Sequence, residues 1–123
     1  MLVIEDHPDT RELLRQMLAP LGARVLLAED ARAGLQVLER QQPHIILLDL
    51  MLPGMDGLTF AHHVHGDPRL TNIPILAVTA LASMADYIQT WSRGFAGHLT
   101  KPVDQAQLAD AIRRVIRGSR RRG

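Results

Sequence analysis

The chain has 123 residues, enough for one domain with a single hydrophobic core, and it lacks any run of the ~18 apolar residues that a membrane span needs. It has no cysteine, which excludes disulfides, zinc–thiolate sites and thiol nucleophiles; because Glu5 and Asp6 also interrupt the apolar start where a secretory leader would continue, we expect a cytoplasmic protein. The net charge is +1, but all 13 acids lie at or before Asp110, so the body of the chain is acidic and poorly suited to bind nucleic acid.

Short apolar runs alternate with segments of helical periodicity, a pattern typical of a parallel sheet with helices on both faces. The apolar runs predict strands at residues 2–5, 24–28, 44–48, 74–78 and 96–99. Helices are predicted near residues 9–21, 31–41, 58–64 and 83–93, with a last helix after Asp104. Right-handed crossovers then favour a five-stranded parallel sheet in the order 2-1-3-4-5, a doubly wound α/β sandwich of the flavodoxin-like (βα)5 type.

The first predicted helix carries signals for both of its ends. Asp9 is expected to be the N-cap, with Glu12 completing a capping box, and Gly22 is expected to end the helix. The inward face of this helix is expected to carry Leu13, Leu14, Met17 and Leu18.

Arginines crowd the end of the chain, on and after the last predicted helix. They are Arg113, Arg114, Arg117, Arg120, Arg121 and Arg122. No aromatic residue accompanies them, so we interpret residues 118–123 as a basic tail or linker stub. Neither nucleic acid nor a membrane is an expected partner.

Polar side chains stand at the carboxyl ends of the predicted strands. Glu5 and Asp6 end the first strand, Asp49 ends the third, Thr79 ends the fourth, and Lys101 follows the fifth. Because the carboxyl ends of parallel strands share one edge of a sheet, we expect these side chains to converge there. Three close carboxylates repel one another unless a cation neutralises them, and their oxygens suit Mg²⁺ or Mn²⁺ better than zinc. With the metal bound, Asp49 can act as a nucleophile towards a phosphoryl donor, while Lys101 and Thr79 contact phosphoryl oxygens.

Four short segments follow one another at the predicted strand ends: LVIED (2–6), LDLMLPGMDG (48–57), AVTA (77–80) and LTKP (99–102). Together they resemble the receiver domain of two-component response regulators, and the likeness covers residues 1–117. The stretches IPILAVTA (73–80) and GFAGHLTKPVD (94–104) are further similar to receivers of hybrid histidine kinases and to single-domain phosphorelay receivers.

The resemblance implies that Asp49 is the phosphoacceptor. It also implies that Mg²⁺ or Mn²⁺ is held by Glu5, Asp6, Asp49 and the backbone carbonyl of Met51. The phosphoryl group would come from a histidine kinase or a histidine phosphotransfer protein, and the chain would be a signalling domain rather than an enzyme, apart from weak self-dephosphorylation. We expect this hydrolysis to be slow, because Met51 and Leu81 are apolar where the family tunes the access of water.

By the same resemblance, Thr79, Ala80 and Lys101 bind the phosphoryl group, and the Lys101–Pro102 peptide bond is cis. Thr79 and the residue three positions before the lysine form the switch of the family, where the second residue is usually aromatic. Here that residue is His98. The sequence leaves open whether His98 switches or is only a half-exposed histidine.

Met84, Tyr87, Ile88 and Trp91 recur at helical spacing on the predicted fourth helix. A stripe of this kind is ordinarily core, a reading that we adopt for Ile88. The resemblance instead turns Met84, Tyr87 and Trp91 outward, where with His98 they would form a partner surface. Both interpretations stay open, as does a homodimer through the fourth helix and the fifth strand.

Two other functions compete with that of a phospho-accepting receiver. A haloacid-dehalogenase-like phosphatase also uses a strand-end Asp, Mg²⁺, Thr and Lys, but usually has a second acid two residues after the nucleophile, where this chain has Met51. A degenerate receiver would act only as a docking scaffold, which the presence of every acceptor residue argues against. The sequence therefore predicts a receiver that takes a phosphoryl group onto Asp49 and then changes its partner binding.

Overall fold

Five parallel strands form one sheet at the centre of the molecule. The computed structural model describes residues 1–22, 24–50, 57–80 and 95–122, with only the backbone described for residues 119–122. The strands are β1 (Leu2–Ile4), β2 (Leu26–Ala28), β3 (Ile46–Asp49), β4 (Ile75–Thr79) and β5 (Gly97–Thr100). Their order in the sheet is β2-β1-β3-β4-β5, with every neighbouring pair parallel. The predicted fold class and strand order are confirmed.

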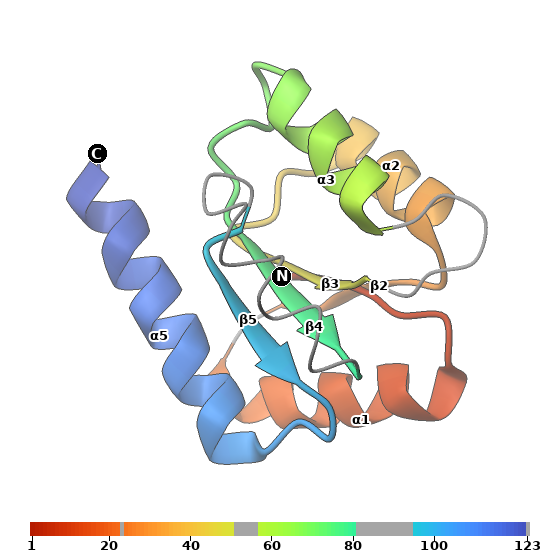
Figure 1. The fold of residues 1–123 in the computed structure, drawn as a ribbon, viewed down its shortest axis with the longest axis vertical. Coiled ribbons are helices and arrows are strands. Elements are labelled where there is room, and N and C mark those ends of the chain that lie inside the picture. Colours follow the sequence, from red (N-terminus) through yellow and green to blue (C-terminus); the bar gives the residue numbers. More distant parts are fainter. Residues whose placement is uncertain (23, 51–56, 81–94, 123) are drawn as a thin grey trace.

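Helices cover both faces of this sheet. The described helices are α1 (Pro8–Leu18), α2 (Ala31–Arg40), α3 (Gly57–Gly66) and α5 (Gln105–Arg122), and the short 3-10 helix η1 (Ala19–Leu21) extends α1. Figure 1 shows α2 and α3 on one face and α1 and α5 on the other. The predicted fourth helix, residues 83–93, lies outside the described residues.

The strand side chains alternate between two hydrophobic clusters, one on each face. Ile4 and Leu48 belong to one cluster with Phe60 of α3. Val3 and Leu47 belong to the other cluster, with buried residues of α1 and α5. Because β1, β3 and β4 are buried on both faces, their sequences are apolar at consecutive positions rather than at alternate ones.

The register of the strands brings their carboxyl ends level. Ile4 pairs with Leu48, so the residues that follow them, Glu5 and Asp49, emerge side by side. Glu5 is tied further to the sheet, because its backbone N–H donates to the carbonyl oxygen of Ala28 at 3.1 Å. The same edge therefore carries every acid that the sequence placed at a strand end.

The prediction for the start of α1 is wrong. His7 is the N-cap residue and Pro8 is the first helical residue, whereas Asp9 lies inside the first turn. Proline suits this position, because its fixed φ is already helical and the N–H that it lacks would have no partner in the helix. Glu12 makes no capping box either, since its carboxylate pairs with the guanidinium of Arg15.

The inward face of α1 is narrower than predicted. Leu14 and Leu18 are buried and Met17 is partly buried, but Leu13 is 49% exposed. The predicted end is confirmed, since Gly22 follows η1 with a left-handed φ of 76° that glycine adopts at low cost.

The helix α5 runs without a break to Arg122, through most of the segment predicted to be a basic tail. Asp104 caps its start, with its Oδ2 accepting from the N–H of Gln107 at 3.1 Å. The boundary of the domain at residue 117 stays a prediction. Within the described residues, no helix combines the length and apolar character that crossing a bilayer requires.

Candidate metal centre

Three carboxylates gather at the carboxyl edge of the sheet. Glu5, Asp6 and Asp49 each place an oxygen within 4.8 Å of the oxygens of the other two. Glu5 is 1% exposed and Asp49 is 4% exposed, while Asp6 faces solvent. The structure thus brings together three acids that lie at the ends of two neighbouring strands, as the sequence predicted.

The ammonium of Lys101 is shared between two of these acids. Its Nζ donates to Glu5 Oε1 at 2.7 Å and to Asp49 Oδ2 at 3.2 Å. The backbone holds the lysine in place, because the N–H of Lys101 donates to the carbonyl oxygen of Thr79 at 2.8 Å. The Lys101–Pro102 peptide bond is cis, the state that the resemblance implied.

The environment of Glu5 favours its neutral form. Burial raises the pKa of Glu5 to about 7, and the neighbouring Asp49 carboxylate raises it too, while Lys101 opposes the rise. Burial by itself lowers the pKa of Lys101, but its bond to Glu5 and the charge of Asp49 raise that pKa overall. Without a cation, the site therefore lowers its negative charge by holding a proton on Glu5 more tightly than an exposed carboxylate would.

The donor set fits a hard divalent cation. The Oε2 of Glu5 is buried and has no hydrogen-bond partner among the described residues, which is costly for a carboxylate. Oxygen atoms from Glu5, Asp6 and Asp49 are the ligands that Mg²⁺ and Mn²⁺ prefer, and within the described part of the chain no histidine or cysteine joins this cluster. A cation held here would satisfy Glu5 and offset the repulsion between the acids.

Thr79 and His98 lie close to this edge of the sheet. Thr79 ends β4 and is fully buried, and its strand partner in β5 is Thr100. His98 is half-buried on β5 beside Ala77, and the exposed Ala80 follows Thr79. The roles of Thr79, Ala80 and His98 in phosphoryl binding and switching stay predictions.

Several predicted residues lie outside the described part of the chain. They are Met51, Leu81, Met84, Tyr87 and Trp91. The backbone ligand, the slow hydrolysis and the partner surface therefore also stay predictions. Arg11 was not predicted to lie near the site, but its Nη1 donates to the carbonyl oxygen of Glu5 at 3.0 Å. The one sequence signal for this contact is the position of Arg11, one turn into the helix that follows Glu5 and Asp6.

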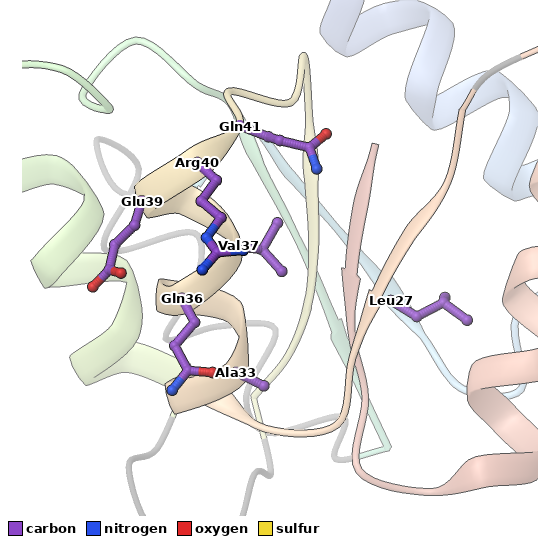
Figure 2. Close-up of a pocket in the computed structure, with 7 residues that line it drawn as sticks. All are labelled: Leu27, Ala33, Gln36, Val37, Glu39, Arg40 and Gln41. Atoms are coloured by element: carbon purple, nitrogen blue, oxygen red, sulfur yellow. The ribbon is translucent and has the colours of Figure 1, made fainter.

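A surface depression of about 650 Å³ lies apart from the acidic cluster. It is lined by residues of α2, by Gln41, which follows α2, and by Leu27 of β2. In Figure 2, Leu27 points away from Val37 and Arg40 of α2, so these side chains do not converge on one point. The depression shares no residue with the acids and is not part of the candidate site.

The family model of the response regulator receiver domain matches residues 1–113. An uncharacterised 14.6 kDa protein of Leptolyngbya boryana is 41% identical over 88% of this chain and 82% of its own length. The response regulator PleD of Caulobacter vibrioides is 37% identical over 95% of this chain, which spans only 26% of PleD.

A solved structure supports the same relationship. The receiver domain of the sensor histidine kinase PA1611 from Pseudomonas aeruginosa is 32% identical and superposes with a TM-score of 0.84, covering 94% of each chain. That structure is described as having a magnesium ion coordinated in its active site cleft.

Proposed function

This chain belongs to the response regulator receiver domain family, and from that premise we propose that it accepts a phosphoryl group on Asp49 with the help of Mg²⁺. The donor would be a phosphohistidine on a histidine kinase or on a phosphotransfer protein. One observation carries the proposal: Asp49 lies within reach of both Lys101, at 3.2 Å, and the acids Glu5 and Asp6. The magnesium in the PA1611 receiver supports it by similarity.

Asp49 would act as the nucleophile. One of its carboxylate oxygens attacks the phosphorus, a P–O bond forms, and the P–N bond to the donor imidazole breaks with its electron pair going to that nitrogen. The carboxylate needs no general base, because it carries no proton when it attacks. The product is an aspartyl phosphate on a residue that is 4% exposed.

Lys101 would stabilise the charge on the phosphoryl group. Its Nζ already lies 3.2 Å from Asp49, so an oxygen of the phosphoryl group on that carboxylate would come within reach of the same ammonium. The hydroxyl of Thr79, at the end of the neighbouring strand, would donate to another oxygen. This division of tasks relies on positioning and charge neutralisation, the two factors that phosphoryl transfer requires.

Glu5, Asp6 and Asp49 would hold the cation, with the Met51 carbonyl as an expected fourth protein ligand. When bound, Mg²⁺ neutralises charge on the carboxylates and on the phosphoryl oxygens. Asp6 would suit a direct contact with the cation, because its carboxylate is exposed to solvent.

The test is incubation with acetyl phosphate and Mg²⁺, followed by intact mass. We expect one adduct of about 80 Da on the wild-type chain. The Asp49→Asn variant, which keeps the shape of the side chain without its charge, should form none. Chelation of Mg²⁺ with EDTA should also prevent formation of the adduct.

The other two functions predict different outcomes. A phosphatase would release inorganic phosphate over many turnovers and accumulate no adduct, whereas a docking scaffold would show neither adduct nor release. An adduct that persists in Asp49→Asn would contradict Asp49 as the acceptor. In each case the folded state of the variant is checked by its circular dichroism spectrum.

A further inference from the structure

Arg11 bonds both residues that flank Asp6. Its Nη1 donates to the carbonyl oxygen of Glu5 at 3.0 Å, and its backbone N–H donates to the carbonyl oxygen of His7 at 2.9 Å. One residue of α1 therefore holds both ends of the short connection from β1 to α1. Asp6 lies in the middle of that connection.

Within the described part of the chain, the Asp6 side chain has no side-chain contact that would hold it in position. It is exposed, and among the described residues it makes no hydrogen bond or ion pair of its own. The backbone turn alone places its carboxylate near those of Glu5 and Asp49. The sheet fixes only one side of the turn, through the bond from the N–H of Glu5 to Ala28.

We propose that Arg11 is a positioning residue for the cation site, which fixes the turn that carries Asp6 without touching the cation. The inference rests on the proposed function, because it assigns Arg11 to the same site. It goes beyond that function by naming a residue outside the acidic cluster that sets the affinity for the metal. Partners that orient metal ligands in this way commonly change metal affinity by tenfold or more.

The positive charge of Arg11 would weaken cation binding, whereas its positioning of the turn would strengthen it. A guanidinium near a cation site repels the incoming cation, so its removal should tighten binding if charge alone mattered. Loss of positioning should weaken binding instead. The direction of the change therefore distinguishes the two roles.

The first experiment measures the Kd for Mg²⁺ by calorimetric titration. Arg11→Met keeps much of the apolar stem and removes the donors and the charge, and we expect its Kd to rise roughly tenfold. Arg11→Lys keeps the charge and a donor but not the planar fork, and we expect a rise of about threefold, a partial rescue. The matched control is Arg15→Met, which removes a charge from the same helix; because Arg15 contacts Glu12 and not the turn, its Kd should stay within about twofold.

A double-mutant cycle with Asp6→Asn separates positioning from general damage to the fold. Asparagine keeps one oxygen ligand, so weak binding stays measurable. If Arg11 acts through Asp6, adding Arg11→Met to Asp6→Asn should change the Kd by less than about twofold, because coupled residues are not additive. A full further loss in the double variant would overturn the proposal.

A second readout needs no metal. In EDTA, ¹⁵N relaxation should show lower order parameters at Asp6 and His7 in Arg11→Met than in the wild-type chain, and unchanged values at Asp49. Unchanged order in the turn, or a Kd equal to or lower than that of the wild type, would overturn the role of Arg11. If the wild-type chain itself failed to bind Mg²⁺, the proposed function would fail first, and this role with it.

Discussion

The ion pair between Lys101 and Glu5 lies in a site that could also bind a metal cation. Lys101 is the one lysine among the charged residues of the chain, and its ammonium is divided between two buried acids. The buried Oε2 of Glu5 has no hydrogen-bond partner among the described residues, which lowers the stability of the folded protein. The same oxygen is free to bind a cation, so the lost stability is accompanied by affinity for that ligand. Burial and the neighbouring Asp49 carboxylate raise the pKa of Glu5, which means that its charged form is poorly stabilised.

The stability of the metal-free protein should depend on the ionisation of Glu5. Its pKa rises from an ordinary 4.5 to about 7 on folding, so the folded state binds the proton more tightly than the unfolded state. The free energy of unfolding should therefore fall as the pH rises across that window, by on the order of 1–2 kcal/mol from this residue. Urea unfolding in EDTA at several pH values between 5 and 8 measures the slope.

The Glu5→Gln variant is the control for this slope. The six histidines also titrate near this range, so only the difference between wild type and variant reports Glu5. The fall in stability with pH should be shallower in Glu5→Gln. Parallel pH profiles for the two proteins would show that Glu5 keeps an ordinary pKa in the folded state.

Gly57 begins α3 close to the end of β3, the strand that carries Asp49. A Cβ added at Gly57 would lie 2.7 Å from the Cα of Leu50 and 3.0 Å from the carbonyl oxygen of Asp49, contacts that backbone atoms cannot relieve easily. We expect Gly57→Ala to destabilise the protein by about 1–3 kcal/mol and to weaken Mg²⁺ binding, because Asp49 must shift. Thermal unfolding and calorimetry measure the two effects.

Gly66, the last residue of the same helix, provides a matched control. A Cβ there would meet nothing within 4 Å, so Gly66→Ala should change stability by no more than about 0.5 kcal/mol. Equal effects of the two substitutions would mean that the close approach at Gly57 is relieved at little cost.

The N-terminus of α2 depends on a single capping side chain. Asp30 has an extended backbone, and its Oδ1 accepts from the N–H of Ala33 at 2.8 Å. Asp30→Ala should therefore lower the free energy of unfolding by about 1 kcal/mol, whereas Asp30→Ser should keep most of it. Chemical denaturation measures the free energy of unfolding of the wild type and of both variants. An equal loss of stability in the two variants would mean that the charge of Asp30 stabilises the helix rather than its hydrogen bond.

The sheet and its acidic edge were predictable because they follow from periodicity and topology. Consecutive apolar residues indicate strands buried on both faces, and the crossover rule then places Glu5 beside Asp49 whatever the details of packing. Lys101 followed from the same rule, since it comes just after the last strand.

Details that depend on contacts between elements were not predictable. Pro8 and Asp9 are both good helix-start signals, and only the path of the chain out of β1 decides between them. Leu13 and Leu14 differ by 100° around α1, so a small rotation of the helix decides which one is buried. The bond from Arg11 to the carbonyl oxygen of Glu5 leaves only a weak signal in the sequence, the place of Arg11 one turn into the helix, because any residue supplies a backbone carbonyl.

At the scale of the whole molecule, the hydrophobic core includes only the first part of α5. Ile112 and Val115 of α5 are buried and Ile116 is partly buried, and no apolar residue follows them. The arginines beyond Ile116 lie near the carboxyl end of a helix, where positive charge is favourable by a few tenths of a kcal/mol to ~1 kcal/mol. The last turns of α5 should therefore contribute little to the stability of the domain.

Truncation after Arg117 tests where the domain ends. We expect the shortened chain to fold, to lose no more than about 1 kcal/mol of stability, and to keep its affinity for Mg²⁺, because the acidic edge and both hydrophobic clusters stay intact. Truncation after Ala111 is the control: it removes Ile112 and Val115 from the core and should cost more than about 3 kcal/mol. A large loss of stability in the first truncation would place the arginines inside the folded unit and move its boundary beyond residue 117.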